Sequence, residues 1–403
     1  MAKDNLEVIR ELARPSPSRI VLLVIDGLGG LPGAGTGKTE LETARTPNLD
    51  RLAAGGTCGL IDPVGPGITP GSAPGHLALF GYDPLGFNIG RGVLEAVGID
   101  FELAPRDIAA RGNFCTVNEA GLITDRRAGR ISTGECAELC RLLDGMVIDG
   151  IKIMICPVRE HRFIVVFRGE GLEPDVSDSD PQQTEVSPEA VTALTPGAAR
   201  MADIAGRFLA ESKTALAQHQ PANMLLLRGF SRKPHFPTMG EVYKLNPAAI
   251  ATYPMYRGLA KLVGMETLET GSGIDDEFAM LEQSYRKYDF FFLHIKGTDS
   301  AGEDGDFDRK VKVIEEVDEA LAGLIRLEPD VVVVTGDHST PAAFKGHSWH
   351  PVPVLLSSKW CRPDRVGEFS EAACLFGGLG RLPATQLMTL AMAHALKLNK
   401  FGA

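Results

Sequence analysis

Acidic and imidazole side chains follow three apolar runs of the chain, "IVLLVI", "FFFLHI" and "VVVV". Oxygen and imidazole donors together suit manganese, zinc or magnesium. Buried carboxylates that meet at one edge of a sheet repel each other unless a cation neutralises them. The pattern therefore predicts a divalent-metal site. Its candidate ligands are Asp26, Asp299, Glu303, Asp337, His338 and His347. Asp299 and Glu303 lie four apart in "TDSAGEDGD", which we interpret as a glycine-rich turn.

A candidate nucleophile, Ser72, lies in "GPGITPGSAPGHLALFGYDP", just before a predicted helix over residues 73–79. The positive end of that helix would suit a phosphate or a developing oxyanion. A serine hydroxyl is a poor nucleophile until a base or a metal lowers its pKa. The alternative interpretation is a helix N-cap. His76, four residues later, could line the same site or pack within the helix core.

The three apolar runs must be the strands that position these side chains. Their hydrophobicity is continuous, which is typical of parallel strands covered by helices on both faces. "TPNLDRLAAGG", opened by Pro47, and "FDRKVKVIEEVDEALAGLIRLEP" predict two such helices. We therefore expect a doubly wound α/β sheet. In such sheets ligands bind at the carboxyl ends of the strands, where the acidic residues fall.

The middle of the chain has a different pattern. "KIMICPV", "HRFIVVFRG" and "NMLLLRGF" predict shorter strands, helices are expected near Glu135–Leu143 and Ala198–Ser212, and "DVSDSDPQQTEVSP" predicts a mobile surface loop. We interpret residues 101–237 as an inserted α+β domain. Residues 1–100 and 238–403 then form a discontinuous core domain.

The composition excludes several classes of partner. The net charge of −11 argues against nucleic acid and anionic membranes. No apolar run reaches the roughly 18 residues that span a bilayer, and the start lacks a leader pattern. The seven scattered cysteines contain no CxxC pair, which predicts reduced thiols in a cytoplasmic protein. A homo-oligomer remains possible.

Six motifs occur in the order found in the alkaline phosphatase superfamily: "DGLGG", "TPNLDRLAAGG", "PGSAPGHLALFGYDP", "HIKGTDSAGEDGD", "TGDHSTP" and "HSWHPVP". Within that superfamily the chain most resembles the archaeal-type, cofactor-independent phosphoglycerate mutases. The resemblance extends to "GRGVLEAVG", "DRRAGRIS" and "YPMYRGLAKLVGM" and so covers nearly the whole chain. It implies an alkaline-phosphatase-like core with an inserted substrate-binding or lid domain.

The resemblance implies an isomerase of glycolysis and gluconeogenesis that interconverts 3-phosphoglycerate and 2-phosphoglycerate through a phosphoserine. It implies two divalent metal ions, Mn²⁺ first and Mg²⁺ or Zn²⁺ next, and no 2,3-bisphosphoglycerate. Glu303 departs from the family, which usually has histidine there, and its oxygen should favour manganese or magnesium over zinc. His350 is a second departure and is not counted as a ligand. By motif, one metal would be held by Asp26, Ser72, Asp337 and His338, and the other by Asp299, Glu303 and His347.

The substrate would be a small phosphorylated anion, and arginines grip a carboxylate in bidentate fashion. The implied catalytic residues besides Ser72 are Arg130 and Asp125, the latter as a proton shuttle. For each of these charged residues the alternative is a solvated surface group. Two other functions remain open: a metal-dependent phosphohydrolase and a phosphotransferase acting on a small alcohol such as homoserine. The implied substrate-binding residues are Arg126, Arg228, Arg257, Lys261 and Lys296.

Overall fold

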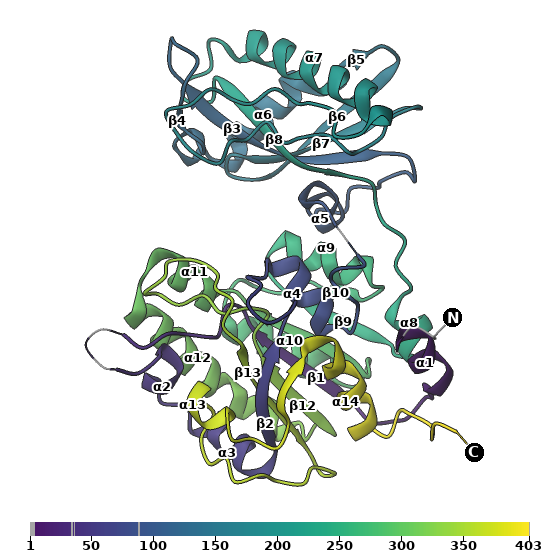
Figure 1. Cartoon of the computed structure of the whole chain (residues 1–403), viewed down its shortest axis with the longest axis vertical. Coiled ribbons are helices and arrows are strands. Elements are labelled where there is room, and N and C mark those ends of the chain that lie inside the picture. Colours follow the sequence, from purple (N-terminus) through teal and green to yellow (C-terminus); the bar gives the residue numbers. More distant parts are fainter. Residues whose placement is uncertain (1–4, 34, 36, 88, 403) are drawn as a thin grey trace. The chain divides into compact units, whose positions relative to one another are not determined.

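The chain folds into two compact units in a computed structural model that describes residues 5–33, 35, 37–87 and 89–402 (Figure 1). Unit 1 joins the part of the chain before residue 89 to residues 236–402, and unit 2 is Ile89–His235. The fold is therefore a discontinuous core with an insertion, and each unit has its own sheet.

Unit 1 is built on an eight-stranded sheet of order β10-β9-β11-β1-β12-β13-β2-β14. Antiparallel pairing is confined to the two neighbours of β13; the other neighbouring strands run parallel. This confirms the predicted α/β class with a mostly parallel sheet. The strands are β1 Ile20–Ile25, β2 Thr57–Asp62, β9 Pro247–Ile250, β10 Glu266–Leu268, β11 Phe290–Ile295, β12 Val331–Thr335, β13 Val352–Ser358 and β14 Gly380–Pro383.

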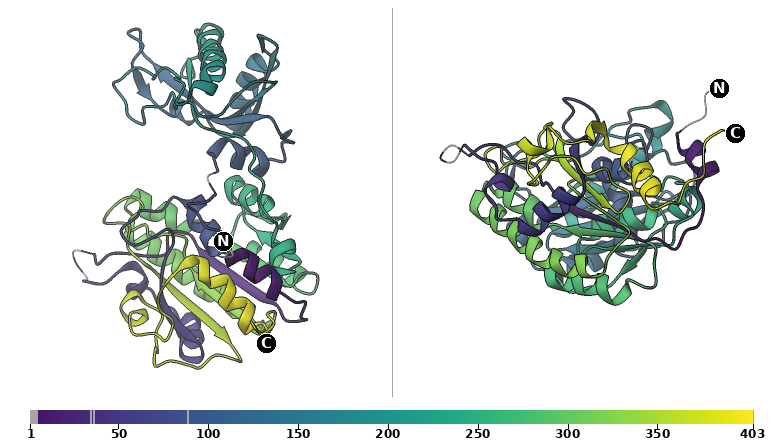
Figure 2. Two further views of the ribbon diagram at one scale, coloured as in Figure 1. Left: turned by 45° about the vertical axis from the view of Figure 1, so that its right-hand side comes forward. Right: turned by 90° about the horizontal axis from the view of Figure 1, so that it is seen from below.

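The central strands are buried along their whole length because helices cover both faces of the sheet. Figure 2 shows α14 (yellow) and α12 (green) on opposite sides. Continuous runs of β-branched and aromatic residues suit this environment. The helices of unit 1 are α1 Asn5–Leu12, α2 Glu40–Thr43, α3 Pro47–Gly55, α4 Ser72–Leu79, α8 Met239–Tyr243, α9 Pro254–Leu262, α10 Ile274–Ser284, α11 Gly297–Asp304, α12 Phe307–Arg326, α13 Glu371–Cys374 and α14 Leu387–His394.

Helix α3 is capped by a side chain from another helix. Its N-cap residue, Thr46, makes no capping hydrogen bond. Instead the buried carboxylate of Asp318 on α12 accepts from the backbone N–H groups of Asn48 (3.0 Å) and Leu49 (2.8 Å). One carboxylate thus satisfies two of the donors that a helix start leaves free and joins α3 to α12.

Unit 2 is an antiparallel sheet of order β4-β3-β7-β6-β5, with β8 also paired to β3. Helices α6 and α7 bury their apolar faces against it in one hydrophobic core. This is the expected α+β arrangement. Its elements are α5 Arg91–Gly98, β3 Ile108–Val117, β4 Ile123–Asp125, α6 Thr133–Leu143, β5 Val147–Ile148, β6 Ile151–Arg159, β7 Arg162–Arg168, α7 Ala199–Leu216 and β8 Met224–Ser231.

Two features of unit 2 differ from the sequence interpretation. Helix α5, which the predicted boundary at residue 101 left in the core, packs on β3 and β8 and so belongs to unit 2. The stretch predicted to be a mobile surface loop is anchored at residues 178–180. Asp178 and Ser179 accept from the β8 backbone, and Ser179 and Asp180 are buried. Polar composition alone could not reveal that these side chains bond inward.

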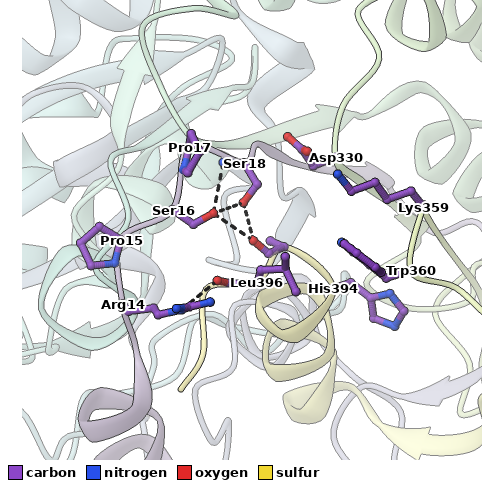
Figure 3. Close-up of a pocket in the computed structure, with 11 residues that line it drawn as sticks. Arg14, Pro15, Ser16, Pro17, Ser18, Asp330, Lys359, Trp360, His394 and Leu396 are labelled. Carbon is purple, nitrogen blue, oxygen red and sulfur yellow. Dashed lines mark hydrogen bonds between the residues drawn. The ribbon is translucent and has the colours of Figure 1, made fainter. Parts of the chain in front are cut away.

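The N-terminal and C-terminal segments of unit 1 are joined at the amino edge of the sheet (Figure 3). The Ser16 hydroxyl donates to the Ala395 carbonyl (3.2 Å), and Arg14 Nε donates to the Leu396 carbonyl (3.1 Å). A cavity of about 470 Å³ lies there, lined partly by Trp360 and His394. It is one strand length, about 20 Å, from the carboxyl edge where the acidic residues gather, so it is not the predicted site.

Among the helices of the described residues, none combines the length and the apolar character needed to cross a membrane.

The Asp318 cap predicts a stability defect. Asp318→Ala should lower the free energy of unfolding by about 2 kcal/mol, because two N–H groups lose their acceptor in a buried place. Chemical denaturation followed by circular dichroism measures this. Glu319→Ala, at an exposed position of the same helix, is the matched control and should change stability by less than about 0.5 kcal/mol. Equal effects of the two substitutions would contradict the cap.

Candidate active site

Three neighbouring strand ends bring the acidic residues together. Strand β1 pairs with β11 on one side and β12 on the other, with their carboxyl ends aligned. The potential ligand atoms of Asp26, Asp337 and His338 lie within 4.8 Å of one another. Those of Asp299, His338 and His347 form a second such group. The two groups share His338.

Asp26 is fully buried, and one of its carboxylate oxygens is surrounded by donors. Oδ2 accepts from the Tyr256 hydroxyl (2.5 Å), from Lys296 Nζ (3.0 Å) and from His294 Nε2 (3.1 Å). Burial and the neighbouring Asp337 raise the pKa of Asp26, but Lys296 and His294 outweigh them and bring it to about 2. Asp26 is therefore ionised over the physiological pH range.

Asp337 and His338 form the second arm of this group. Asp337 Oδ1 accepts from the Gly27 backbone N–H (3.1 Å), while Oδ2 lies 3.1 Å from both His76 Nδ1 and His338 Nε2. Burial opposes ionisation of Asp337, but the charges of His338 and His76 hold its pKa well below the usual range. Burial lowers the pKa of His338, and the surrounding carboxylates, Asp337 first, outweigh this and raise it to about 8.

Asp299 and Glu303 lie on a helix, not in the glycine-rich turn that the sequence suggested. Helix α11 runs through "GTDSAGED" and ends at Gly305, which is left-handed (φ 75°). A spacing of four puts both carboxylates on one face. Asp299 Oδ1 lies 3.5 Å from His347 Nε2, and Glu303 Oε1 lies 3.9 Å from the same nitrogen. Glu303 is 57% exposed, so it forms the solvent side of the second group.

His347 presents one defined nitrogen to these carboxylates. Its Nδ1 lies 2.9 Å from the Pro70 carbonyl oxygen. A carbonyl only accepts, so Nδ1 carries the proton and Nε2 faces Asp299 and Glu303. The His347 ring also stacks on His338, with 3.6 Å between ring centroids.

Ser72 is the first residue of α4, and Gly71 holds the N-cap position without a side-chain cap. The N-cap alternative for Ser72 is therefore wrong. Its Oγ lies 3.3 Å from His338 Nε2. The helix approaches so closely that a Cβ at Gly75 would lie 2.3 Å from the Asp337 carbonyl oxygen, so only glycine fits. His76 Nδ1 lies 2.8 Å from the Ser72 carbonyl oxygen, which places His76 in the site.

The donors fit divalent cations. Asp26 Oδ1 and Asp337 Oδ2 are buried and accept no well-aligned hydrogen bond from the described residues, although two imidazole nitrogens lie 3.1 Å from Asp337 Oδ2. Such orphaned carboxylate oxygens are costly unless a cation binds them. Lys296 is the cation nearest to both groups, since its Nζ donates to Asp26 and to Asp299. Carboxylate and imidazole donors suit manganese, magnesium or zinc.

The other predicted substrate residues of unit 1 lie on α9. Arg257 is mostly buried and pairs with Glu269. Lys261 follows it by one helical turn and is half-buried. Since α9 also carries Tyr256, which donates to Asp26, this helix connects two predicted substrate-binding residues to the carboxylate cluster.

Two of the four predicted residues of unit 2 contact a carboxylate, Asp180, that the sequence did not single out. Arg126 grips Asp180 in bidentate fashion (3.0 and 2.7 Å), and Arg228 Nη1 lies 3.7 Å from the same carboxylate. Asp125 accepts from the backbone N–H groups of residues 127 and 129, and Arg130 is exposed with a left-handed backbone (φ 55°). Two arginines thus face one buried carboxylate.

His294 and Tyr256 were missed as site residues by the sequence reasoning. Both are fully buried, their rings stack with 3.8 Å between centroids, and both donate to Asp26. His294 stands inside the apolar run "FFFLHI", where an imidazole without a partner would be unfavourable. That polar residue in a buried strand was a usable signal. Tyr256 carried none, because a tyrosine on an amphipathic helix is common.

Comparison with known proteins gives consistent matches. A family model described as 2,3-bisphosphoglycerate-independent phosphoglycerate mutase matches residues 53–223. A probable enzyme of that name from Thermosipho melanesiensis is 50% identical over 402 residues, covering 99% of this chain and 100% of the relative. Its counterpart from Thermus thermophilus is 47% identical over 405 residues, with the same coverage.

Solved structures agree with these matches. A protein from Pyrococcus horikoshii superposes with a TM-score of 0.83 at 28% identity, covering 96% of this chain and 99% of the other. The cofactor-independent phosphoglycerate mutase from Thermoplasma acidophilum superposes with a TM-score of 0.70 at 30% identity, covering 94% and 100%.

The orphaned carboxylate oxygens predict metal-dependent stability. Excess Mn²⁺ should raise the thermal midpoint of unit 1 by several degrees over protein kept in a chelator, because a ligand at about 100 times its Kd adds about 2.7 kcal/mol. Asp337→Asn should abolish this shift. Asp62→Asn is the control: this carboxylate ends β2 in the same sheet but pairs with Arg381, so the variant should keep the shift. A shift retained by Asp337→Asn would contradict the site.

Proposed function

The chain belongs to the 2,3-bisphosphoglycerate-independent phosphoglycerate mutases, and we propose on this basis that it interconverts 3-phosphoglycerate and 2-phosphoglycerate through a phosphoserine at Ser72. One observation carries the assignment of the nucleophile. Ser72 Oγ stands at the start of α4, 3.3 Å from His338 Nε2, beside buried carboxylates with orphaned oxygens.

The proposed cofactors are two divalent metal ions. Asp26, Ser72, Asp337 and His338 would hold one, and Asp299, Glu303 and His347 the other. When bound, the ions would lower the pKa of the Ser72 hydroxyl and stabilise charge on the phosphoryl oxygens. Manganese is the proposed metal, since Glu303 adds a hard oxygen donor where zinc would favour histidine.

The phosphoryl group moves from the substrate to Ser72 and then back to the substrate, in two steps. First, Ser72 Oγ attacks phosphorus and the bond from phosphorus to the substrate's 3-oxygen breaks, which leaves phosphoserine and glycerate. The proton of Ser72 and the charge on the leaving oxygen together restore the glycerate hydroxyl. Then the 2-oxygen of glycerate attacks the phosphorus of phosphoserine, the bond from phosphorus to Ser72 Oγ breaks, and the proton of the 2-hydroxyl restores the Ser72 hydroxyl.

Lys296 is proposed to contact the phosphoryl oxygens. Its ammonium group contacts both acidic groups, because it pairs with Asp26 in the group beside Ser72 and with Asp299 in the other. Two divalent cations would neutralise the same carboxylates and leave this charge for the substrate. Lys261 on α9 is proposed to bind substrate phosphate as well, and Arg257, one turn before it, is proposed to grip the carboxylate of glycerate.

The residues of unit 2 are assigned to the glycerate part of the substrate. Arg126 and Arg228 both face Asp180, and guanidinium groups placed side by side in this way support binding of a carboxylate. Arg130 is proposed as a further contact, and Asp125 as the group that carries a proton between the two glycerate hydroxyls. The proposed location is the cytoplasm, because charged phosphoglycerates do not cross lipid bilayers.

Ser72→Ala tests the nucleophile. Purified protein with Mn²⁺ and 3-phosphoglycerate, without added 2,3-bisphosphoglycerate, should form 2-phosphoglycerate, and this variant should lose at least about 10³-fold in kcat because no oxygen remains to accept phosphate. Enzymatic detection of 2-phosphoglycerate and of free phosphate measures both products.

Thr69→Ala, at an exposed position of the loop before α4, is the control and should keep wild-type turnover. Release of phosphate without 2-phosphoglycerate by the wild type would favour the phosphohydrolase. Turnover retained by Ser72→Ala would remove Ser72 from the mechanism.

Glu303→His tests the metal preference. The wild type should be most active with Mn²⁺, and the variant should shift toward Zn²⁺ by about tenfold in the activity ratio, because imidazole replaces an oxygen donor. Turnover measured across the two metals gives this ratio. Asp304→His adds a histidine to the neighbouring exposed position and should leave the ratio unchanged. An unchanged ratio in Glu303→His would mean that Glu303 is not a ligand.

A further inference from the structure

Thr340 lies between the two acidic groups of the candidate active site. It follows His338 by two residues in the loop after β12 and is fully buried. Its hydroxyl oxygen lies 2.7 Å from Asp299 Oδ1 and 2.9 Å from His338 Nδ1. One side chain thus contacts a member of each group.

The direction of these two hydrogen bonds follows from the donors available. A hydroxyl has one proton to donate and a carboxylate only accepts. Asp299 accepts from the Lys296 ammonium through its other oxygen. Thr340 therefore donates to Asp299 and must accept from His338. Nδ1 of His338 carries the proton in this arrangement.

The tautomer decides which nitrogen of His338 can act. With Nδ1 held by Thr340, the other nitrogen is the one left to bind a cation. Nε2 lies 3.1 Å from Asp337 Oδ2, 3.3 Å from Ser72 Oγ and 3.4 Å from Asp26 Oδ1. Oδ1 of Asp26 and Oδ2 of Asp337 are the orphaned carboxylate oxygens. Thr340 thus aims His338 at the proposed metal and nucleophile.

The backbone of Thr340 is fixed by a buried lysine. Its N–H donates to the Gly29 carbonyl (3.0 Å), and its carbonyl accepts from Lys310 Nζ (2.9 Å). Lys310 Nζ also donates to the Gly29 carbonyl (3.0 Å), and its side chain is completely buried on α12. Gly27 leaves the room that the hydroxyl needs: its backbone is left-handed (φ 66°), and a Cβ there would lie 2.6 Å from Thr340 Oγ1.

We propose that Thr340 is a positioning residue of the active site, which fixes the Nδ1–H form of His338 and couples it to Asp299, while Lys310 fixes the loop that carries Thr340. The inference rests on the proposed metal centre. Groups that orient metal ligands in this way contribute about 10–100-fold to metal affinity or activity. A hydroxyl that only filled space could be replaced by a methyl group without that loss.

Thr340→Val and Thr340→Ser separate the two roles. Valine keeps the shape and removes the hydroxyl, whereas serine keeps the hydroxyl. The Thr340→Val variant should bind Mn²⁺ about 10–100-fold more weakly, as measured by electron paramagnetic resonance of free Mn²⁺. Its kcat should fall by a larger factor than its KM changes. Thr340→Ser should recover most of both. Thr335→Val removes another buried hydroxyl, which donates to the Pro353 carbonyl on β13, and should leave Mn²⁺ affinity unchanged.

A metal-free measurement separates failure of this inference from failure of the proposed function. In protein labelled with ¹⁵N-histidine and kept in a chelator, the His338 Nδ1–H signal should be protected from exchange in the wild type and Thr340→Ser. It should be lost in Thr340→Val. Wild-type Mn²⁺ affinity in Thr340→Val, or a His338 signal unchanged by it, would overturn the role of Thr340. A wild type that binds no Mn²⁺ but shows the signal would instead refute the metal centre.

Discussion

The site depends on the burial of like charges at one edge of a parallel sheet. Asp26 and Asp337 end adjacent strands, are both fully buried, and are both held ionised by the cations around them. Two such carboxylates repel in a low-dielectric place unless positive charge lies between them. The cluster therefore requires cations, and Lys296 and the proposed metal ions are the groups that can supply them.

The elements around the cluster can be understood from this requirement. Asp26 is held by three donors on one oxygen, from Tyr256, His294 and Lys296, which leaves the other oxygen free for a cation. The loop after β12 is also fixed by hydrogen bonds. Lys310 donates to the Thr340 carbonyl, and the Thr340 hydroxyl donates to Asp299. A preorganised cluster of this kind loses little free energy to rearrangement when charge develops at the phosphoryl group.

The second group is more open to solvent than the first. Asp299 is buried, but Glu303, one helical turn later, is 57% exposed. An exposed carboxylate keeps its hydration and binds a cation less tightly than a buried one. The departure from the usual histidine thus lies on the solvent-exposed side of the second group.

Much of the fold and part of the site followed from local patterns. The apolar runs predicted buried parallel strands, and the acidic residues at their ends predicted a cluster, because the carboxyl ends of neighbouring parallel strands meet at one edge. Pro47 and the helical spacing after Phe307 predicted α3 and α12. The predicted turn at Asp299 was wrong because a glycine-rich, acidic composition outweighed the spacing of four that fits a helix.

What the sequence by itself determined was the type of the central strands and of several helices, and the identity of most candidate ligands, because these depend on residues close together in the chain. Only the tertiary structure decided which oxygens remain unpaired and which nitrogen of His338 is free. Those properties depend on partners far away in sequence: Tyr256 lies 230 residues and His294 lies 268 residues from Asp26. Hydrogen-bond partners at such separations are fixed by the packing of whole strands and helices, which no local pattern records.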